Sequence, residues 1–325
     1  MTPPANRSPS IGVGTWAWGN QFLWGYDPKQ DSAIQAAFQR AVALGLHFFD
    51  TADSYGTGRW NGRSEQLLGR WCAELPAHRK DNLTVATKLA PFPWRLGRRG
   101  FDRAFAASRD RLQGKLDRVQ LHWSTARYAP WQELPLLHGL ADRVLAGEVA
   151  ELGVSNVGPR RLRRLHGLLA ERGVRLTSVQ VQFSLLSPEA VAPGGVADVC
   201  RELGIEWIAY SPLALGWLAP SPDHVRPLPP GPRGVLFRRL SQGAGALREG
   251  VVRLARAREV PAAAIALNWC RAHGALPIPG LRRVDQVEVA AAALAWELSL
   301  EERQELDALA MANSARMPAN PFQSA

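Results

Sequence analysis

The sequence has few of the features that mark a membrane, secreted or metal-binding protein. No run of about 18 uncharged apolar residues occurs, which argues against a membrane-spanning helix. Residues Met1 to Ser10 lack the apolar segment of a signal peptide. No Walker A pattern, His-Glu-x-x-His or paired Cys/His spacing is present. The sequence therefore predicts no metal site, no membrane association and a cytoplasmic location.

Cysteine and lysine are both scarce. The three cysteines, Cys72, Cys200 and Cys270, are far apart and form no C-x-x-C pair, which favours buried, reduced thiols. The chain has 39 basic and 29 acidic residues, a net charge of +10, and almost all of the excess is arginine. These arginines occur mostly singly or in pairs along predicted helices. We therefore interpret the charge as compositional bias and solvated helix faces rather than a nucleic-acid groove.

Short apolar runs alternate with amphipathic stretches from end to end. We predict strands at Ile11–Gly14, His47–Asp50, Leu83–Lys88, Arg118–Trp123, Glu151–Val154, Ser178–Phe183, Glu206–Tyr210 and Leu276–Ile278. We predict helices at Asp31–Leu44, Arg63–Leu75, Phe101–Leu112, Trp131–Ala146, Pro159–Arg172, Gly195–Leu203, Ala246–Arg258 with Ala262–Ala272, and Val284–Leu294. Strict alternation favours a parallel sheet covered by helices. Eight units predict an α/β fold closed as a (β/α)8 TIM barrel, although an open doubly wound sheet also fits the alternation.

No linker divides the chain, so we predict one domain over residues 1–325. Residues 1–10 and 313–325 are expected to be flexible termini. The stretch from Pro212 to Gly245 is rich in Pro and Gly and is predicted to be a long loop after the seventh strand. Ile11 to Gly14 begins like a dinucleotide-binding loop, but its third glycine is misplaced and no helix follows, which argues against a Rossmann domain.

Polar residues at the ends of three predicted strands suggest an active site. In barrels of this kind the active site lies at the carboxyl ends of the strands. Asp50 ends the second strand with Tyr55 close behind it, Lys88 ends the third, and His122 lies near the end of the fourth. Each residue has a structural alternative: a helix cap, a turn residue, a surface lysine or a packed histidine. The set is harder to explain in this way, because a lysine at the end of an apolar strand needs a partner, and Asp50 is available.

These four residue types suit the reduction of a carbonyl group. Hydride addition produces an alkoxide that must receive a proton, and Tyr55 is the candidate acid. We expect the Lys88 cation to favour the phenolate and so to lower the pKa of Tyr55. Asp50 would keep Lys88 charged and in place. His122 would donate a hydrogen bond to the carbonyl oxygen and orient the substrate.

The sequence resembles the aldo-keto reductase family over nearly its whole length. The strongest segment runs from Phe49 to Gly56 (Phe-Asp-Thr-Ala-Asp-Ser-Tyr-Gly), followed by Ser64 to Gly69. Further matching segments are Gly12 to Trp16, Leu121 to Trp123, Gly153 to Asn156, Ala209 to Leu213, and Pro277 to Gly280 with Arg282, Arg283 and Gln286. The resemblance implies a (β/α)8 barrel that binds NADPH in an extended form and reduces carbonyl compounds.

The resemblance also implies roles for individual residues. The catalytic tetrad would be Asp50, Tyr55, Lys88 and His122, with Tyr55 as the proton donor. On the nicotinamide side, the cofactor would be bound by Gly14 and Thr15, by Ser155, Asn156 and Gln180 at the carboxamide, and by Tyr210 stacked on the ring. Its pyrophosphate would contact Ser211 and Leu213. The phosphate loop would contribute Gly280, Arg282 and Gln286. Val289 and Ala290 stand where the family often has an acidic residue and an asparagine, so we expect fewer hydrogen bonds to adenine.

A phosphate site at the last loop is also expected on physical grounds. A guanidinium fork is well suited to a 2′-phosphate, and the start of the helix near Val284 adds the positive end of a helix dipole. Arg282 and Arg283 therefore favour NADPH over NADH, with Arg282 as the first candidate and the other as a solvated loop residue.

The substrate is harder to predict than the cofactor. Twelve tryptophans are present, and several fall in predicted loops at the strand ends. We expect Trp16, Trp24 and Trp123 to line a pocket for a small carbonyl compound that is flat or apolar. Pro321 and Phe322 lie in a tail that either covers this pocket or is a frayed terminus. The oligomeric state is not predicted.

Three other functions remain open from the sequence. A non-catalytic regulatory subunit could bind NADPH and keep all four tetrad residues. A Schiff-base lyase would use Lys88 as a neutral nucleophile, which Asp50 opposes. Binding to nucleic acid through the basic surface lacks a recognised motif.

Overall fold

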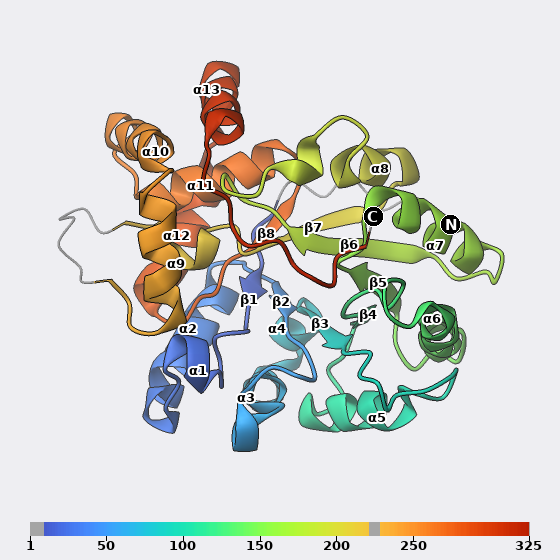
Figure 1. The fold of residues 1–325 in the computed structure, drawn as a ribbon. Helices are drawn as coiled ribbons and strands as arrows, with labels where there is room; N and C mark the ends of the chain where they lie inside the picture. The colour runs from blue at the N-terminus through green and yellow to red at the C-terminus, as the bar shows by residue number, and fades with distance from the viewer. Residues whose placement is uncertain (1–9, 221–227, 325) are drawn as a thin grey trace.

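The protein is a single (β/α)8 barrel. The computed structural model describes residues 10–220 and 228–324. Its sheet runs in the order β1 to β8, with every neighbouring pair parallel. The strands are β1 Val13–Gly14, β2 Phe48–Asp50, β3 Thr84–Leu89, β4 Arg118–Leu121, β5 Glu151–Ser155, β6 Leu176–Gln182, β7 Glu206–Tyr210 and β8 Leu276–Ile278. They surround the centre of Figure 1.

The helices form an outer layer around these strands (Figure 1). They are α1 Gln21–Trp24, α2 Asp31–Ala43, α3 Arg63–Ala73, α4 Ala77–Asp81, α5 Asp102–Arg111, α6 Pro130–Leu145, α7 Pro159–Ala170, α8 Val196–Leu203, α9 Pro232–Ser241, α10 Gly245–Ala257, α11 Ala262–Ala272, α12 Val284–Ala292 and α13 Leu300–Ala312. Large rings fill the space between the layers. Phe38 on α2 packs on Phe49 of β2 with ring centres 5.2 Å apart, and Trp71 on α3 lies 5.9 Å from Phe38. Burial of such rings is a main source of stability in this layer.

Glycines allow the last strand to return to the first. The backbone N–H groups of Gly12 and Gly14 donate to the carbonyl oxygens of Pro277 and Pro279, each at 2.9 Å. A Cβ atom on Gly14 would lie 2.7 Å from the carbonyl oxygen of Ile278, closer than real contacts allow. A side chain at this position would therefore push β8 away from β1.

The predicted order of strands and helices is confirmed, with one correction. All eight predicted strands are present, each within a few residues of its expected bounds. The stretch from Pro212 to Gly245 is not wholly a loop, because it contains α9; residues 221–227 of it lie outside the described part of the chain. Pro232 takes the first turn of α9, where a missing N–H is tolerated, and Leu240 is fully buried in the core. Helix α13 is a further element, in the region after Leu294 that sequence patterns left unassigned.

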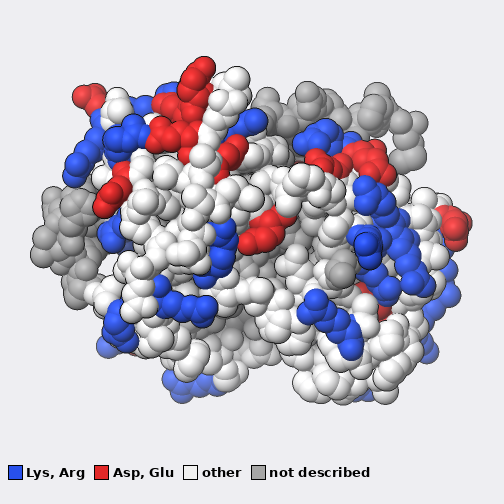
Figure 2. All heavy atoms as spheres, turned by 45° about the horizontal axis from the view of Figure 1, so that its top comes forward, with Lys and Arg blue, Asp and Glu red and all other residues white. Residues whose placement is uncertain are grey.

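Basic and acidic side chains are interspersed on the surface. Figure 2 shows lysine and arginine in several separate groups, many of them beside aspartate or glutamate. Several of the surface arginines are paired: Arg163 contacts Glu202 at 2.6 Å, and Arg201 contacts Asp198 at 2.9 Å. Among the described residues, no helix is both long and apolar enough to cross a membrane.

Candidate active site

The fold brings the four predicted catalytic residues to one mouth of the barrel. Asp50 is the last residue of β2, Lys88 lies near the end of β3, and His122 follows β4 directly. Tyr55 lies in the turn after β2, where its backbone N–H donates to the carbonyl oxygen of Ala52 at 3.1 Å. Because parallel strands end on the same side, residues from three consecutive strands become neighbours in space.

Lys88 and Asp50 form a buried ion pair, and the side chain of each is only 1% exposed. Lys88 Nζ lies 2.5 Å from Asp50 Oδ2 and also donates to the carbonyl oxygen of Thr51 at 2.8 Å. The other carboxylate oxygen, Asp50 Oδ1, accepts from Gln180 Nε2 at 2.7 Å and from Gln120 Nε2 at 3.2 Å. Both charges are thus compensated by hydrogen bonds, as buried charges must be.

Tyr55 and His122 lie above this pair. Lys88 Nζ is 4.8 Å from the centre of the Tyr55 ring. The His122 ring meets Tyr55 edge-on, with ring centres 5.8 Å apart, and His122 Nδ1 is 3.4 Å from Ser54 Oγ. Both rings are only partly exposed. The four side chains therefore form one contiguous group.

The protonation states differ from one sequence-based expectation. Burial, reinforced by the charge of Asp50, raises the pKa of Tyr55 well above its usual value, so the expectation of a lowered pKa is wrong. The physical reason is that the positive charge of Lys88 is already matched by Asp50, while desolvation disfavours the phenolate. Burial lowers the pKa of Lys88, although Asp50 opposes this effect. Burial, followed by the charges of Lys88 and Arg95, lowers the pKa of His122 well below its usual value. At neutral pH, Tyr55 is consequently a phenol and His122 is neutral.

The matching segment from Ser64 to Gly69 supports the site from behind. Ser64 Oγ lies 2.6 Å from Thr15 Oγ1 and 2.9 Å from Thr51 Oγ1, which links the loops after β1 and β2. Glu65 accepts from Thr87 of β3 at 2.5 Å and from Arg111 at 2.6 Å. These contacts fix the backbone beside Asp50 and Lys88. The hydroxyl of Thr15, a residue that the sequence predicted as a cofactor contact, forms its hydrogen bonds within this network.

The predicted carboxamide contacts lie beside His122, but their polar groups bind one another. Asn156 has a positive φ of 58°, and its Nδ2 donates to the His122 carbonyl oxygen at 3.0 Å and to Ser155 Oγ at 3.2 Å. Its Oδ1 accepts from the Tyr210 hydroxyl at 2.8 Å. Gln180 is directed to Asp50, as described above. Asn156 and Tyr210 are thus joined at the mouth.

The remaining predicted cofactor residues lie around β7 and β8. Ser211 follows Tyr210 with a positive φ of 53°, and Leu213 precedes the short helical turn Ala214–Gly216. Gly280 pairs with Gly14 across the closure of the barrel. Gln286 Oε1 accepts from the backbone N–H of Arg282 at 2.9 Å, so this glutamine shapes the loop that carries Arg282.

Two arginines next to the Trp24 ring form a cationic site. Arg282 donates to the Trp24 carbonyl oxygen at 3.0 Å, and its guanidinium lies 5.3 Å from the Trp24 ring. Arg233 on α9 lies 4.2 Å from the same ring, donates to the carbonyl oxygen of Leu215 at 2.9 Å, and has a buried Nε without a partner. Burial lowers the pKa of both arginines, and among the described residues neither forms an ion pair with a carboxylate. By contrast, Arg283 is exposed and paired with Asp285 at 2.8 Å.

Sequence analysis missed Arg233 because it assigned this part of the chain to a loop. The only sequence signal is Pro232, which is typical of the first turn of a helix. Arg233 and Trp24 are far apart in the sequence, so sequence patterns do not predict that they are in contact.

The three predicted pocket tryptophans occupy different places. Trp16 lies 6.5 Å from Tyr55, and Trp123 lies 5.0 Å from His122, measured between ring centres. Trp24 meets the edge of Trp16 at 6.3 Å and is one ring farther from Tyr55, against the two arginines. Trp16 and Trp123 are therefore the nearer candidates for contact with a substrate.

The carboxyl-terminal segment crosses the mouth of the barrel, as Figure 1 shows in red. Phe322 stacks on Trp123 with ring centres 4.9 Å apart. Asn320 Nδ2 donates to Asn156 Oδ1 at 2.9 Å and to the Tyr210 hydroxyl at 3.1 Å, and the backbone N–H of Ser324 donates to the Asn156 carbonyl oxygen at 3.1 Å. These contacts give the positions of Asn320, Phe322 and Ser324, and the flexibility expected for residues 313–325 stays a prediction. Residues 1–9, which were also expected to be flexible, lie outside the described part of the chain.

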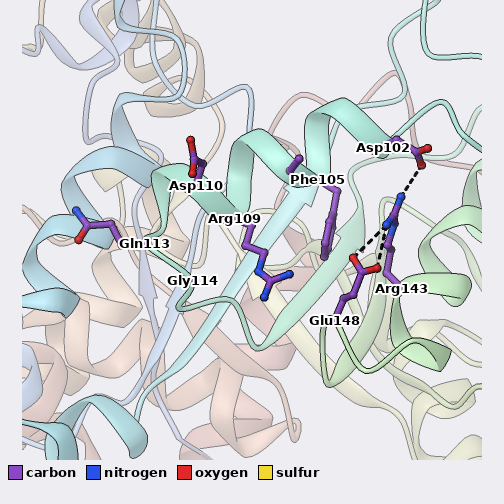
Figure 3. Close-up of a pocket in the computed structure, with 9 residues that line it drawn as sticks. Asp102, Phe105, Arg109, Asp110, Gln113, Gly114, Arg143 and Glu148 are labelled. Carbon is purple, nitrogen blue, oxygen red and sulfur yellow. Dashed lines mark hydrogen bonds and ion pairs between the residues drawn. The ribbon is translucent and has the colours of Figure 1, made fainter.

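The hollows on the outside of the barrel lie away from this site. Figure 3 shows one of about 360 Å³ between α5 and α6, in which Arg143 is paired with Asp102 at 2.7 Å and with Glu148 at 3.0 Å. The hollow lies on the outer helices and includes none of the four tetrad residues. Within residues 10–220 and 228–324, no three His, Cys, Asp or Glu side chains cluster in a way that could hold a metal ion.

Comparison with known proteins agrees with the fold. The model of the aldo/keto reductase family matches residues 10–311. Pyridoxal reductase, chloroplastic, from Arabidopsis thaliana is 45% identical over 99% of this chain and 88% of its own length. A crystal structure of an aldo/keto reductase from Klebsiella pneumoniae in complex with NADP and acetate has a TM-score of 0.73 and 26% identity, covering 98% of this chain and 95% of its own.

A second structure of an aldo-keto reductase from Klebsiella pneumoniae, in complex with NADPH, has a TM-score of 0.70 and 26% identity, with 97% of this chain and 93% of its own covered. Membership of this family implies a small carbonyl substrate, and NADP or NADPH is the cofactor held in both of these structures. The chain belongs to the aldo/keto reductase family and is an NADP-dependent oxidoreductase.

Proposed function

We propose that this protein reduces an aldehyde to an alcohol with NADPH, and that Tyr55 donates the proton. The observation that carries the proposal is the buried Lys88–Asp50 pair, whose ammonium group lies 4.8 Å from the Tyr55 ring with His122 beside it. Pyridoxal is the first substrate to test, because a relative 45% identical over nearly the whole chain is named for its reduction. The relatives give no support to a non-catalytic regulatory role.

The neighbouring side chains provide what a proton donor needs. The raised pKa of Tyr55 keeps its phenol protonated at neutral pH. An alkoxide is a much stronger base than a phenolate, so it accepts the proton from Tyr55 readily. Lys88, whose ammonium group lies 4.8 Å from the ring, offsets part of the cost of burying the phenolate that remains. Neutral His122 is free to donate a hydrogen bond to the carbonyl oxygen and orient it toward Tyr55.

The residues around Trp24 fit the phosphates of NADPH, which supplies the hydride when it is bound. Arg233 and Arg282 are two partly buried cations without a carboxylate partner among the described residues. Such a pair favours an anion, and a phosphate dianion can accept from both guanidinium groups. At the other end of the cofactor, Asn156 and Tyr210 offer an amide and an aromatic ring beside His122.

An aromatic aldehyde fits the walls beside the tetrad. Trp16 stands near Tyr55, and Trp123 stands near His122 with Phe322 stacked on it. Flat aromatic surfaces favour flat substrates through stacking and edge-on contacts. A pyridine ring with an aldehyde group, as in pyridoxal, has this shape.

The first prediction concerns the proton donor. We expect the wild-type protein to oxidise NADPH in the presence of pyridoxal. Tyr55→Phe should lower kcat at least about 100-fold while the Kd for NADPH stays within about twofold, because only the proton donor is lost. NADPH absorbance and fluorescence titration measure the two quantities. Tyr26→Phe, which removes a phenol hydroxyl that contacts Asp31 and Arg63 outside the tetrad, is the matched control and should keep full turnover. Equal turnover in Tyr55→Phe and wild type would exclude Tyr55 as the donor.

The second prediction concerns pH. The pKa of Tyr55 is raised and that of His122 is lowered, so neither residue changes its protonation between about pH 6 and 9. We therefore expect kcat for reduction to stay flat over this range and to fall only at higher pH, where Tyr55 loses its proton. Single-turnover rates across the range provide the measurement. A midpoint near the usual histidine value, about 6.5, would contradict a neutral His122.

The third prediction concerns the phosphate site. We expect Arg282→Ala and Arg233→Ala each to raise the Kd for NADPH about tenfold or more, because each removes a charge-assisted hydrogen bond. If the bound group is the 2′-phosphate, the Kd for NADH should change little; if it is the pyrophosphate, both should rise. Arg283→Ala is the control, since Arg283 is paired with Asp285. A Kd for NADPH unchanged in Arg233→Ala would remove Arg233 from the site.

A further inference from the structure

Gln120 lies beneath the active site, where its side chain contacts Asp50. It is fully buried on β4, and its Nε2 donates to Asp50 Oδ1 at 3.2 Å. The same oxygen accepts from Gln180 at 2.7 Å, while Asp50 Oδ2 faces Lys88 at 2.5 Å. The two carboxylate oxygens of Asp50 therefore make different contacts. Oδ1 accepts hydrogen bonds from two glutamine amides, and Oδ2 pairs with the ammonium group of Lys88.

The register of the sheet places Gln120 in the same layer as Lys88. The paired positions run from Lys88 on β3 to Gln120 on β4, then to Gly153 on β5 and Ser178 on β6. Side chains at paired positions of neighbouring strands point to the same face. In this layer, Gln120 stands beside the lysine and reaches across to the aspartate at the end of β2.

Gly153 provides the space that Gln120 needs. A Cβ atom at position 153 would lie 3.0 Å from Gln120 Cγ and 2.4 Å from Ser178 Oγ. Any larger residue there would displace Ser178 Oγ first and would also press on the glutamine side chain. The match of Gly153 to the family motif thus has a local physical reason in this chain, which is room for Ser178 and Gln120.

The amide of Gln120 has its orientation set by Asp50. Its Oε1 has no protein partner, and neither does Ser178 Oγ, although both are buried. Turning the amide over would place Oε1 against the carboxylate and lose the only hydrogen bond that the amide makes within the described residues. In this orientation the amide N–H of Gln120 donates to Asp50 while its Oε1 is buried without a hydrogen bond. The hydrogen bond to the charged carboxylate therefore outweighs the cost of leaving Oε1 unpaired.

We propose that Gln120 is a positioning residue of the active site, which acts through Asp50 to hold Lys88 beneath Tyr55. By binding Oδ1 from the barrel interior, it fixes the rotation of the carboxylate so that Oδ2 faces Lys88 Nζ. Gln180 assists from β6. The proposal rests on the proposed function only for its kinetic consequence, since the contact with Asp50 exists independently of the reaction.

The test is Gln120→Met, which keeps the length of the side chain and removes the N–H donor. We expect kcat to fall about tenfold, as for the loss of one hydrogen bond to a charged group, while the Kd for NADPH stays within about twofold. The conservative control is Ser178→Ala, which removes an unpartnered hydroxyl from the same layer and should leave kcat unchanged. Gln120→Asn, which keeps the amide but is too short to reach Asp50, should behave like Gln120→Met if the methionine variant folds poorly.

A second readout does not depend on activity. In protein labelled with ¹³C at the lysine Cε carbon, with the signal assigned by its loss in Lys88→Met, Gln120→Met should move the titration of Lys88 to lower pH. The reason is that the carboxylate, which favours the charged ammonium group, is no longer held with Oδ2 facing Lys88 Nζ. The other titratable groups around Lys88 are Asp50, Asp53, Glu65, Tyr55 and His122, and the variant leaves all of them in place.

The outcomes separate the two proposals. A fall in kcat with unchanged NADPH binding and a shifted Lys88 titration supports the positioning role. An unshifted Lys88 titration in Gln120→Met overturns it, and so does an equal effect of Ser178→Ala. If the wild-type protein has no turnover, the proposed function fails, and the Lys88 titration alone still decides the role of Gln120.

Discussion

The site depends on a lysine and an aspartate that share a buried ion pair at the mouth of the barrel. Each side chain is 1% exposed, and neither charge would be stable there alone. Two glutamine amides and a backbone carbonyl oxygen complete the hydrogen bonds of the pair. Because Asp50 balances the charge of Lys88, burial has a larger effect on the pKa of Tyr55 than the lysine charge has. The pKa of Tyr55 is therefore raised, and its phenol keeps its proton.

The barrel supplies the geometry that this pair requires. Consecutive parallel strands carry Asp50, Lys88 and His122 to the same end of the sheet, and Gly153 leaves room for the amide of Gln120 below them. At the rim, loops from distant parts of the chain bring Trp24, Arg233 and Arg282 together. One end of the mouth is therefore suited to proton transfer and the other to an anion, which matches an extended cofactor carrying both a reactive ring and phosphates.

The sequence predicts those features that are set locally or by the order of the strands. Eight apolar runs, separated by amphipathic stretches, predicted a parallel α/β fold, and the family resemblance favoured a closed barrel over an open sheet. Polar residues at strand ends were enough to predict Asp50, Lys88 and His122 as neighbours. Contacts between distant segments were not predictable. Arg233 meets Trp24, and Asn320 meets Asn156, only after folding. The pKa of Tyr55 was predicted in the wrong direction because the sequence shows a nearby lysine but not the burial of the phenol or the matching of that lysine by Asp50.

The most direct test of this account is a double-mutant cycle on the ion pair. The free energy of unfolding would be measured for Lys88→Met, Asp50→Leu and the double variant. Removing one partner leaves the other charge buried and uncompensated, so each single change should destabilise the protein by about 3 kcal/mol. The double variant should recover most of that loss, because two apolar side chains replace two charges. If the two single effects simply add, the pair is not the mutual constraint on which the site depends.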